Sequence, residues 1–359
     1  MTIGRPPAMS VIRLSAGYAG RAVLHDVDLD VAAGEFAAIL GSSGCGKTTL
    51  LRTIAGFQTA LAGEVMLFGR DVTTAPPERR DLAMVFQSYA LWPHMTVLGN
   101  IGYGLKLRGV GRDQIRSRVE AVLDMLNLSG LIERKVTDLS GGQRQRVALG
   151  RALAIEPKIL LLDEPLSNLD AKVRLQLRVE IKSLQRKLGF AAIHVTHDRE
   201  EAMTMADRIV VMDQGRIIQC GRPEEVYDQP QSPFIASFMG ADNTIDIDVA
   251  VTARGSEISA EGARAPVLWQ GRMPAGRARA YFREDAARLM VDGAAVADTL
   301  ILPARIVSRA YPGGHYRYGV AVGDCNYSVN DPASREPDTP ISLGLAIKDL
   351  HVFPIAESK

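Results

Sequence analysis

A glycine-rich run that ends in Lys-Thr constrains the fold of this chain more than any other feature. The run is Gly41, Ser42, Ser43, Gly44, Cys45, Gly46, Lys47 and Thr48. Residues 36–40 before it are continuously apolar and predict a strand, and residues 48–55 after it predict a helix. Glycines let backbone N–H groups approach a phosphate, and the N-terminus of the following helix favours an anion. The pattern therefore predicts a phosphate-binding loop in an α/β domain.

The polar side chains of this loop have distinct predicted roles. Lys47 is expected to reach the β- and γ-phosphates of a nucleotide, and the Thr48 hydroxyl is expected to ligate Mg²⁺. We interpret Cys45 as a small side chain of the loop rather than as a redox centre. A chance match to the pattern in a chain of this length is on the order of 1%, so a plain glycine-rich turn is a poor alternative.

Two carboxylates follow a second buried strand. Residues 159–162 are all aliphatic, and Asp163 and Glu164 come directly after them. The carboxyl ends of parallel strands form the usual ligand edge of an α/β sheet. Asp163 is a candidate Mg²⁺ ligand and Glu164 a candidate general base for an attacking water. A solvated loop or a helix cap is the alternative for these residues in isolation.

Three further side chains have weaker individual signals. Gln87 follows an apolar run and could contact both Mg²⁺ and the attacking water, although a surface glutamine is the alternative. His197 follows the largely apolar run 191–195 and could donate to the γ-phosphate, although a lone histidine is more often structural. Tyr18 could stack on adenine, and its alternative is a core aromatic.

A second glycine-rich segment lies far along the chain. Leu139, Ser140, Gly141, Gly142 and Gln143 precede a helical pattern at 143–154. The first amides of that helix could face an anion. Together with the phosphate loop, this segment predicts that ATP is approached from two sides.

Composition limits the class of protein. The chain has 359 residues, of which 47% are hydrophobic and 23% charged, which fits a globular protein of two domains. A net charge of +1 gives no electrostatic basis for binding nucleic acid, so we expect no such partner. Three scattered cysteines favour a reducing compartment. Residues 1–7 hold no apolar signal core, and no apolar run approaches the roughly 20 residues that cross a bilayer.

The character of the sequence changes near residue 240. Before that point, residues 11–14 and 27–31 predict strands, and residues 112–128, 143–154 and 171–188 predict helices. The short apolar runs at 159–162 and 191–195 suit strands buried on both faces, so this part predicts an α/β domain with a mostly parallel sheet. Beyond it, strand-like runs at 245–249, 277–282, 300–307 and 316–322 predict a small all-β barrel or sandwich. We place the boundary at about 235–243, with an ATPase domain at 1–240 and a β domain at 241–359.

Taken together, these motifs resemble the ATP-binding subunit of a bacterial ABC importer. In this resemblance Tyr18 matches the adenine-stacking aromatic, residues 41–49 match the Walker A loop, and Gln87 matches the Q-loop glutamine. Residues 139–143 match the signature motif, and Asp163 with Glu164 matches the Walker B pair. Residues 167–170 match the D-loop, and His197 matches the switch histidine. The family implies a P-loop NTPase cassette with a helical subdomain at about 88–157. Segments 281–285, 313–316 and 350–354 look like the family's C-terminal OB-type transport-associated domain. Gly150 departs from the Ala usual in the signature helix, which costs about 1 kcal/mol in helix propensity.

The resemblance also implies a mechanism and partners. Two chains would enclose two ATP molecules, each held by residues 41–49, including Thr49, and capped by Ser140, Gly141, Gly142, Gln143 and Asp170 at the dimer interface. Integral membrane permeases would contact the subunit at the cytoplasmic face of the inner membrane, and a periplasmic binding protein would deliver solute to them. We expect residues 87–100, with exposed Tyr89, Leu91, Trp92 and Met95, to form the permease-docking surface; packing of the helical subdomain is the alternative.

The solute is less constrained than the activity. The overall resemblance favours ferric iron or a phosphonate such as 2-aminoethylphosphonate, followed by polyamines and sugars. A soluble ABC ATPase of DNA repair or translation, and a regulatory protein whose C-terminal barrel senses a ligand, are the rival classes. No long coiled-coil insert or second cassette is visible in the sequence, and the catalytic set is intact.

Overall fold

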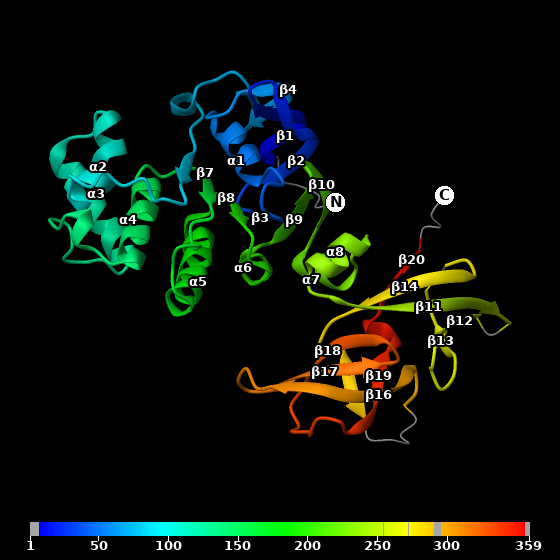
Figure 1. Ribbon diagram of the computed structural model, residues 1–359. Helices are drawn as coiled ribbons and strands as arrows, with labels where there is room; N and C mark the ends of the chain where they lie inside the picture. The colour runs from blue at the N-terminus through cyan, green and yellow to red at the C-terminus, as the bar shows by residue number, and fades with distance from the viewer. Residues whose placement is uncertain (1–6, 254, 272, 291–295, 356–359) are drawn as a thin grey trace. The chain divides into compact units, whose positions relative to one another are not determined.

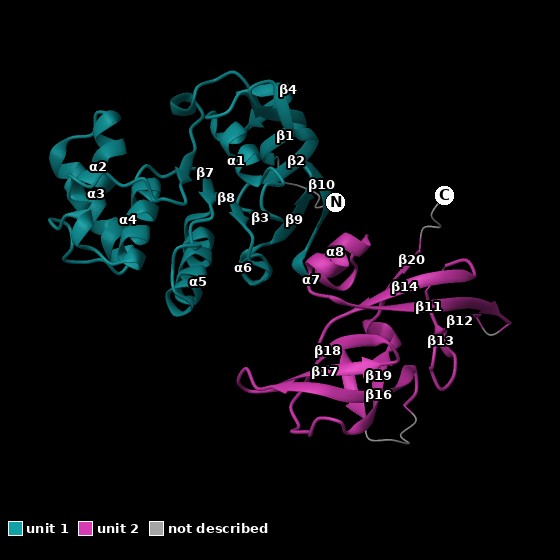
Figure 2. Ribbon diagram, in the orientation of Figure 1, with its two compact units in different colours: residues 1–224 teal, residues 225–359 magenta. Residues whose placement is uncertain are grey.

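The computed structural model describes residues 7–253, 255–271, 273–290 and 296–355. The chain forms two compact units, residues 1–224 and 225–359 (Figure 2). This division falls before the boundary that the sequence suggests near residue 240, because the short helix α8 (Pro233–Phe238) packs against β14 (Gly276–Phe282) of the second unit. Residues 1–6, part of the segment expected to lack a signal core, lie outside the described residues.

The centre of the first unit is a six-stranded sheet (Figure 1). Five of its strands run parallel, and β10 pairs antiparallel with β9 at one edge. Strands β3, β7 and β8 are buried at every residue, as their largely apolar sequences require when both faces of a sheet are covered. The predicted mostly parallel core is therefore confirmed. In spatial order the strands are β10 (Arg216–Gly221), β9 (Arg208–Asp213), β3 (Phe36–Gly41), β8 (Ala191–Thr196), β7 (Ile159–Asp163) and β6 (Ala83–Val85).

The first two strands of the chain belong to a separate antiparallel sheet. The runs 11–14 and 27–31 are strands as predicted, but both strands are longer than these runs. Ala19 and Gly20, with φ of 49° and 77°, form a two-residue turn that suits the twist of a hairpin and lets the strands extend to it. The strands of this sheet, in order, are β2 (Arg21–Ala32), β1 (Pro7–Tyr18), β4 (Ala60–Leu67) and β5 (Arg70–Asp71).

Helices of the first unit fall into two groups (Figure 1). One group accompanies the sheet and the other forms a separate helical cluster, which fits the predicted helical subdomain. Among the described residues, no helix is both long and apolar enough to span a bilayer. The helices near the sheet are α1 (Lys47–Ala55), α5 (Ala171–Leu188) and α6 (Arg199–Met205), and the clustered helices are α2 (Val97–Leu107), α3 (Arg112–Met125) and α4 (Gly141–Leu153).

The structure explains two details of the helical cluster that helix propensity alone does not: where α3 ends and why α4 contains a glycine. Helix α3 ends at Met125 rather than at 128, because Asn127 adopts the left-handed region with φ of 54°. Gly150 in α4 has a packing reason: a Cβ there would lie 3.0 Å from Cδ1 of Leu126 and 3.1 Å from Cγ1 of Val122. A side chain here would require its neighbours to shift by a few tenths of an ångström, so this glycine lies at a close contact of the helical cluster.

The second unit is all-β apart from short helical segments, as predicted. Two five-stranded antiparallel sheets share one apolar core that includes Phe282 and Tyr318, both fully buried. The four runs named from the sequence lie in β11 (Asn243–Thr252), β14, β16 (Thr299–Ala310) and β17 (Tyr316–Val322). The remaining strands are β12 (Gly255–Ser259), β13 (Val267–Trp269), β15 (Ala287–Met290), β18 (Cys325–Asp331), β19 (Pro340–Ala346) and β20 (His351–Pro354).

Candidate nucleotide-binding and hydrolysis site

The predicted site residues gather because four parallel strands end at the same edge of the sheet. Strand β3 runs into Gly41, β6 is followed by Gln87, β7 ends in Asp163 and β8 is followed by His197. Parallel strands present their carboxyl ends together, so segments far apart in sequence meet at one place.

The loop between β3 and α1 depends on its glycines. Gly44 and Gly46 have φ of 82° and 106°, which L side chains rarely adopt. A Cβ on Gly41 would lie 2.4 Å from the carbonyl oxygen of Met212 on β9. Ser42, Ser43 and Gly44 are exposed at the tip. The loop is thus a close-packed turn with an open rim, which is the shape that backbone amides need to surround a phosphate.

Lys47 lies inside this turn. Its side chain is buried, and Nζ donates to the carbonyl oxygens of Gly41 at 2.8 Å and Ser42 at 3.0 Å. Among the described contacts, this cation has no carboxylate partner. Cys45 is buried beside it, with Sγ 3.9 Å from Nζ, and burial raises the pKa of the thiol. A neutral thiol packed in the loop agrees with the interpretation of Cys45 as a small loop side chain.

Thr48 and Asp163 come together across 115 residues of sequence. The Thr48 hydroxyl donates to Oδ1 of Asp163 at 3.0 Å. Asp163 is only 5% exposed, and burial raises the pKa of its carboxyl, partly offset by the Thr48 hydrogen bond. Hydroxyl and carboxylate oxygens are the ligands that Mg²⁺ prefers, so the pair fits this ion. No group of three His, Cys, Asp or Glu gathers in the described residues, and Mg²⁺ characteristically completes its shell with phosphate oxygens and water.

Glu164 lies between the other two candidate catalytic residues. Oε2 of Glu164 accepts from Nε2 of Gln87 at 3.1 Å, and Oε1 lies 3.5 Å from Nδ1 of His197. The structure thus brings all three predicted catalytic side chains together. Their individual roles stay predictions.

The backbone around Glu164 is unusual. Glu164 has φ of 44°, and its N–H donates to the carbonyl oxygen of Val195 at 3.1 Å. Its own carbonyl accepts from the Ser167 hydroxyl at 2.9 Å. Asn168 of the same loop donates to the backbone carbonyl of Gln87 at 3.1 Å. A left-handed conformation held by several hydrogen bonds at a cluster of polar groups is typical of functional sites.

Tyr18 is placed near the start of α1. The residue is 46% exposed, and its hydroxyl lies 3.5 Å from Oγ1 of the buried Thr49. Tyr18 is therefore not a core aromatic, and its open ring is available for stacking.

Ser140 is the N-cap of helix α4. Its hydroxyl accepts from the Gln143 N–H at 3.3 Å, while Oε1 of Gln143 accepts from the Ser140 N–H at 2.9 Å, which makes a reciprocal capping box. A Cβ on Gly142 would lie 2.9 Å from Cγ1 of Val173 on α5. The glycine-rich segment thus packs beside the start of α5, where Asp170 caps the helix through the N–H of Val173 at 3.0 Å.

The four side chains of segment 87–100 that were predicted to be exposed are all at least partly buried. Tyr89 is buried, with only 8% exposure, whereas Leu91, Trp92 and Met95 are partly buried. The expectation of an exposed Tyr89 is wrong, because the turn after Gln87 places its side chain in the apolar core of the helical cluster. The packing alternative therefore accounts for Tyr89.

Two arginines near the site were missed from the sequence. Arg178 on α5 donates to Asp198, next to His197, at 2.7 Å and is itself only 5% exposed. Arg151 on α4 donates to the carbonyls of Tyr89 and Ala90, just beyond Gln87. In the sequence, each is only an arginine within a predicted helix. That pattern is the same for an exposed arginine, so it did not indicate these contacts.

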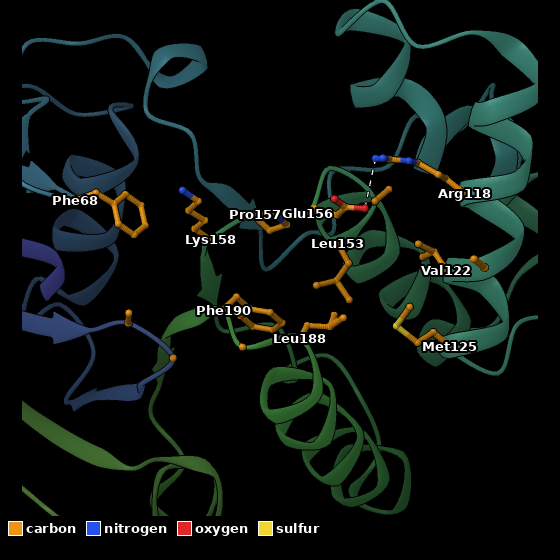
Figure 3. A pocket seen from close by; sticks show the side chains of 15 residues that line it. Phe68, Arg118, Val122, Met125, Leu153, Glu156, Pro157, Lys158, Leu188 and Phe190 are labelled. Atoms are coloured by element: carbon orange, nitrogen blue, oxygen red, sulfur yellow. Dashed lines mark ion pairs between the residues drawn. The ribbon is translucent and has the colours of Figure 1, made fainter. Parts of the chain in front are cut away.

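The amphipathic cavity of Figure 3 is not this site. It has a volume of about 610 Å³ and is lined by Lys158 and Phe190, which precede β7 and β8, and by Val122 and Met125 of α3. It lies at the amino ends of the strands, and none of the predicted nucleotide-site residues lines it.

Comparisons with known proteins agree with this architecture. A sequence model of the family described as "ABC transporter" matches residues 24–167. The chain is 41% identical over 346 residues to an Fe(3+) ions import ATP-binding protein of Rhizobium etli, covering 95% of this chain and 96% of that protein. It is 44% identical over 362 residues to an sn-glycerol-3-phosphate import ATP-binding protein of Burkholderia thailandensis, covering 98% and 99%. A spermidine/putrescine import ATP-binding protein of Clostridium novyi is 38% identical over 336 residues, covering 94% of each.

A solved structure is also similar. The CbiO1 protein of Clostridium perfringens, part of the ABC transporter complex CbiONQ, matches with a TM-score of 0.58 and 29% identity. The match covers 62% of this chain and 91% of that one.

Fold and site together define a phosphate-loop ATPase whose glycine-rich loop, paired carboxylates and helical cluster form one cassette. The chain belongs to the ABC transporter family and is the ATP-binding subunit, the ATPase, of an importer.

Proposed function

We propose that this ATPase works as a homodimer that hydrolyses Mg²⁺-bound ATP and drives solute import through membrane permeases. The observation that carries the proposal is the contact of Glu164 with Gln87 and His197, at the sheet edge where Thr48 meets Asp163. A base, a polar amide and an imidazole converge beside a hydroxyl–carboxylate pair suited to the metal. This is the set that ATP hydrolysis needs.

Each side chain has a definite role in this proposal. Lys47 exchanges its carbonyl acceptors for phosphate oxygens. Thr48 and Asp163 hold Mg²⁺, which neutralises charge on the phosphates when bound. Glu164 accepts the proton of the attacking water. Gln87 and His197 orient that water and the γ-phosphate, and Tyr18 stacks on adenine.

The position of Ser140 and its glycines supports a site shared between two chains. Ser140, Gly141 and Gly142 open α4 in the helical cluster and pack toward Leu169 and Val173. Within one chain, no hydrogen bond is described between this segment and residues 41–49. The N-terminus of α4 is thus suited to cap the nucleotide of a second copy, together with Gln143 and Asp170.

Permeases and a periplasmic binding protein are the proposed partners. The named relatives are import proteins, and an imported solute must cross the membrane. In this proposal the permeases form that pathway, and this subunit binds to them. We place the subunit at the cytoplasmic face of the inner membrane. The partly buried Leu91, Trp92 and Met95 and the exposed Pro93 and His94 are the proposed docking contacts.

Ferric iron and sn-glycerol-3-phosphate are the proposed solutes, ahead of a phosphonate, a polyamine or a sugar. Ferric iron is favoured by the sequence resemblance and named for one relative at 41% identity. Glycerol-3-phosphate is named for relatives at 44% and 49% identity. Uptake of radiolabelled iron and of labelled glycerol-3-phosphate by cells that lack this gene, complemented with the native chain or with Glu164→Gln, decides between them. A solute whose uptake is equal in all three strains is excluded.

The Glu164→Gln variant also tests the site itself. Because the amide keeps its size but cannot accept the proton, we expect ATP binding to persist while kcat falls about 100-fold or more. ATP should then hold a stable dimer, measurable by sedimentation velocity. Hydrolysis by this variant at the parental rate would refute the assignment of Glu164 as the base.

A further inference from the structure

Arg151 makes an unusual contact with the segment that follows Gln87. Its two terminal nitrogens donate to two consecutive backbone carbonyls, Ala90 at 2.6 Å and Tyr89 at 2.8 Å. The planar guanidinium fork fits two neighbouring acceptors, which a lysine ammonium does only as a point charge. This pairing fixes the orientation of both peptide groups at once.

The two residues that receive these bonds have strained backbones. Tyr89 and Ala90 both adopt the left-handed region, with φ of 64° and 46°, and neither is glycine. Consecutive left-handed residues with a Cβ are unfavourable, so such a turn persists only when its surroundings hold it. The hydrogen bonds from Arg151 stabilise this turn. The guanidinium also makes a cation–π contact with the Trp92 ring, whose centroid lies 4.9 Å from Cζ of Arg151.

The strained turn carries Gln87. The Tyr89 N–H donates to the Phe86 carbonyl at 2.8 Å, which closes the turn around Gln87. From there the Gln87 side chain reaches Oε2 of Glu164 at 3.1 Å. A shift of the Tyr89–Ala90 peptides therefore moves Gln87 relative to Glu164.

Arg151 belongs to the helix that begins at the signature segment. Ser140 caps α4, and Arg151 lies about three turns further along the same helix. A helix of this length moves as a rigid body. A displacement of α4 at Ser140 would therefore also displace Arg151 and the backbone carbonyls of Tyr89 and Ala90 that it binds. Buried Asn100 holds the far side of the segment, since its Oδ1 accepts from the Trp92 N–H at 2.9 Å.

We propose that Arg151 is a positioning residue for Gln87, and that it links the Gln87 turn to the helix that closes on the partner's nucleotide. The proposal rests on the catalytic role proposed for Gln87. Helix α4 then has two roles, because the helix that caps one ATP also sets the geometry of Gln87 at the ATP held by its own chain.

A double-mutant cycle on the full chain tests this proposal. The variants are Arg151→Met, Gln87→Ala and the double variant, and steady-state Mg²⁺-ATP hydrolysis gives kcat and KM for each. We expect Arg151→Met to lower kcat about tenfold, with KM for ATP within about twofold, since Arg151 does not touch the nucleotide loop. If Arg151 acts through Gln87, the double variant should be no slower than Gln87→Ala alone.

Arg146→Met is the matched control. Arg146 lies on the same helix and pairs with Glu180 at 2.8 Å, but it has no described contact with the Gln87 turn. Because it makes no described contact with Gln87, Tyr89 or Ala90, its loss should leave kcat within about twofold of the native chain. Arg151→Lys, which keeps the charge without the fork, should show an intermediate kcat and provides the comparison if Arg151→Met unfolds.

The outcomes separate the two proposals. If Gln87→Ala leaves kcat unchanged, the role of Gln87 fails and the inference for Arg151 fails with it. If Gln87→Ala lowers kcat but the effect of Arg151→Met or Arg151→Lys multiplies with it, Arg151 acts independently and only the positioning role is overturned. A fall of kcat in Arg146→Met as large as in Arg151→Met overturns it as well.

Discussion

Two strand carboxylates, Asp163 in the first unit and Asp246 in the second, lie in opposite environments. In the first unit, Asp163 ends a strand that is buried along its whole length, and burial raises the pKa of its carboxyl. In the second, Asp246 lies on a strand with one open face, and hydrogen bonding to Arg279 at 2.6 Å lowers the pKa of its carboxyl. The first carboxylate has no described arginine or lysine within ion-pair distance, whereas the second is neutralised.

The difference follows from sheet architecture. Parallel strands covered on both faces are apolar until they end, so polar groups concentrate at one edge and share a site. Antiparallel strands with one open face alternate, as the buried and exposed residues of β11 do, and their charges are spread and paired across strands. Chemistry is therefore concentrated in the first unit, while the second unit contributes a core of its own.

Phe282→Ala is the largest expected change and is confined to the second unit. The ring is fully buried and contacts Tyr327 with centroids 5.5 Å apart, so its loss should destabilise that unit by about 3–5 kcal/mol. Hydrogen exchange should accelerate in segments between 243 and 350 and not in 36–55. Phe353→Ala, at a partly buried edge position, should cost less. Equal loss of protection in both units would contradict their separate cores.

Asp163→Asn should lower Mg²⁺-dependent ATPase about 100-fold while making the protein without nucleotide more stable at neutral pH. A carboxyl whose folded pKa is raised binds its proton more tightly when folded. Stability therefore falls as pH rises from the ordinary aspartate value of 3.8 through the raised one. Asparagine removes this loss. Thermal unfolding in EDTA at neutral pH measures the stability, and a lower midpoint for the variant would contradict the sign.

Ser140→Arg should lower ATPase about tenfold or more without weakening nucleotide binding to the single chain. The added charge and bulk obstruct the N-terminus of α4, where a second chain must approach. Sedimentation with ATP should show no dimer for this variant when it is combined with Glu164→Gln. Ser334→Arg, at an exposed loop position of the second unit, is the control and should still dimerise. ATP-driven dimers of the Ser140 variant would refute the shared site.

Asp246→Asn should have the smallest effect, about 0.2–1 kcal/mol at neutral pH, because its side chain is 43% exposed. Its folded pKa is lowered, so the contribution is present above the ordinary aspartate value and is lost as pH falls through the folded value. Unfolding by urea at neutral pH and in strong acid measures this difference, which should also shrink in high salt. ATPase should not change.

Much of the first unit could be predicted from the sequence because its signals are local. The spacing from Gly41 to Thr48 requires a strand, a turn and a helix, and the structure has β3 and α1 there. The aliphatic run before Asp163 and the largely apolar run before His197 predict the strands that bring these residues to one edge. The separate sheet of β1 and β2 was not predicted, because the sequence of a strand does not specify which other strand it pairs with.

Other features had no local signal. The apolar and aromatic residues after Gln87 fit either a docking surface or a core, and only the left-handed turn at Tyr89 and Ala90 decides that Tyr89 is buried. From the sequence, Gly150 only lowers helix propensity. Its close contact with Leu126 and Val122 is evident only in the structure. The second unit could be predicted as β from its alternation, but which strands share a sheet could not.

The sequence by itself determined the chemistry of this protein, because phosphate loops, strand-end carboxylates and helix caps are set by residues close together in the chain. Tertiary structure alone decided which of these groups touch. Glu164 meets Gln87 across 77 residues, and Arg151 holds the turn beyond Gln87 across 61 and 62. Such contacts depend on how buried strands and helices pack, which is a property of the whole core rather than of any one segment.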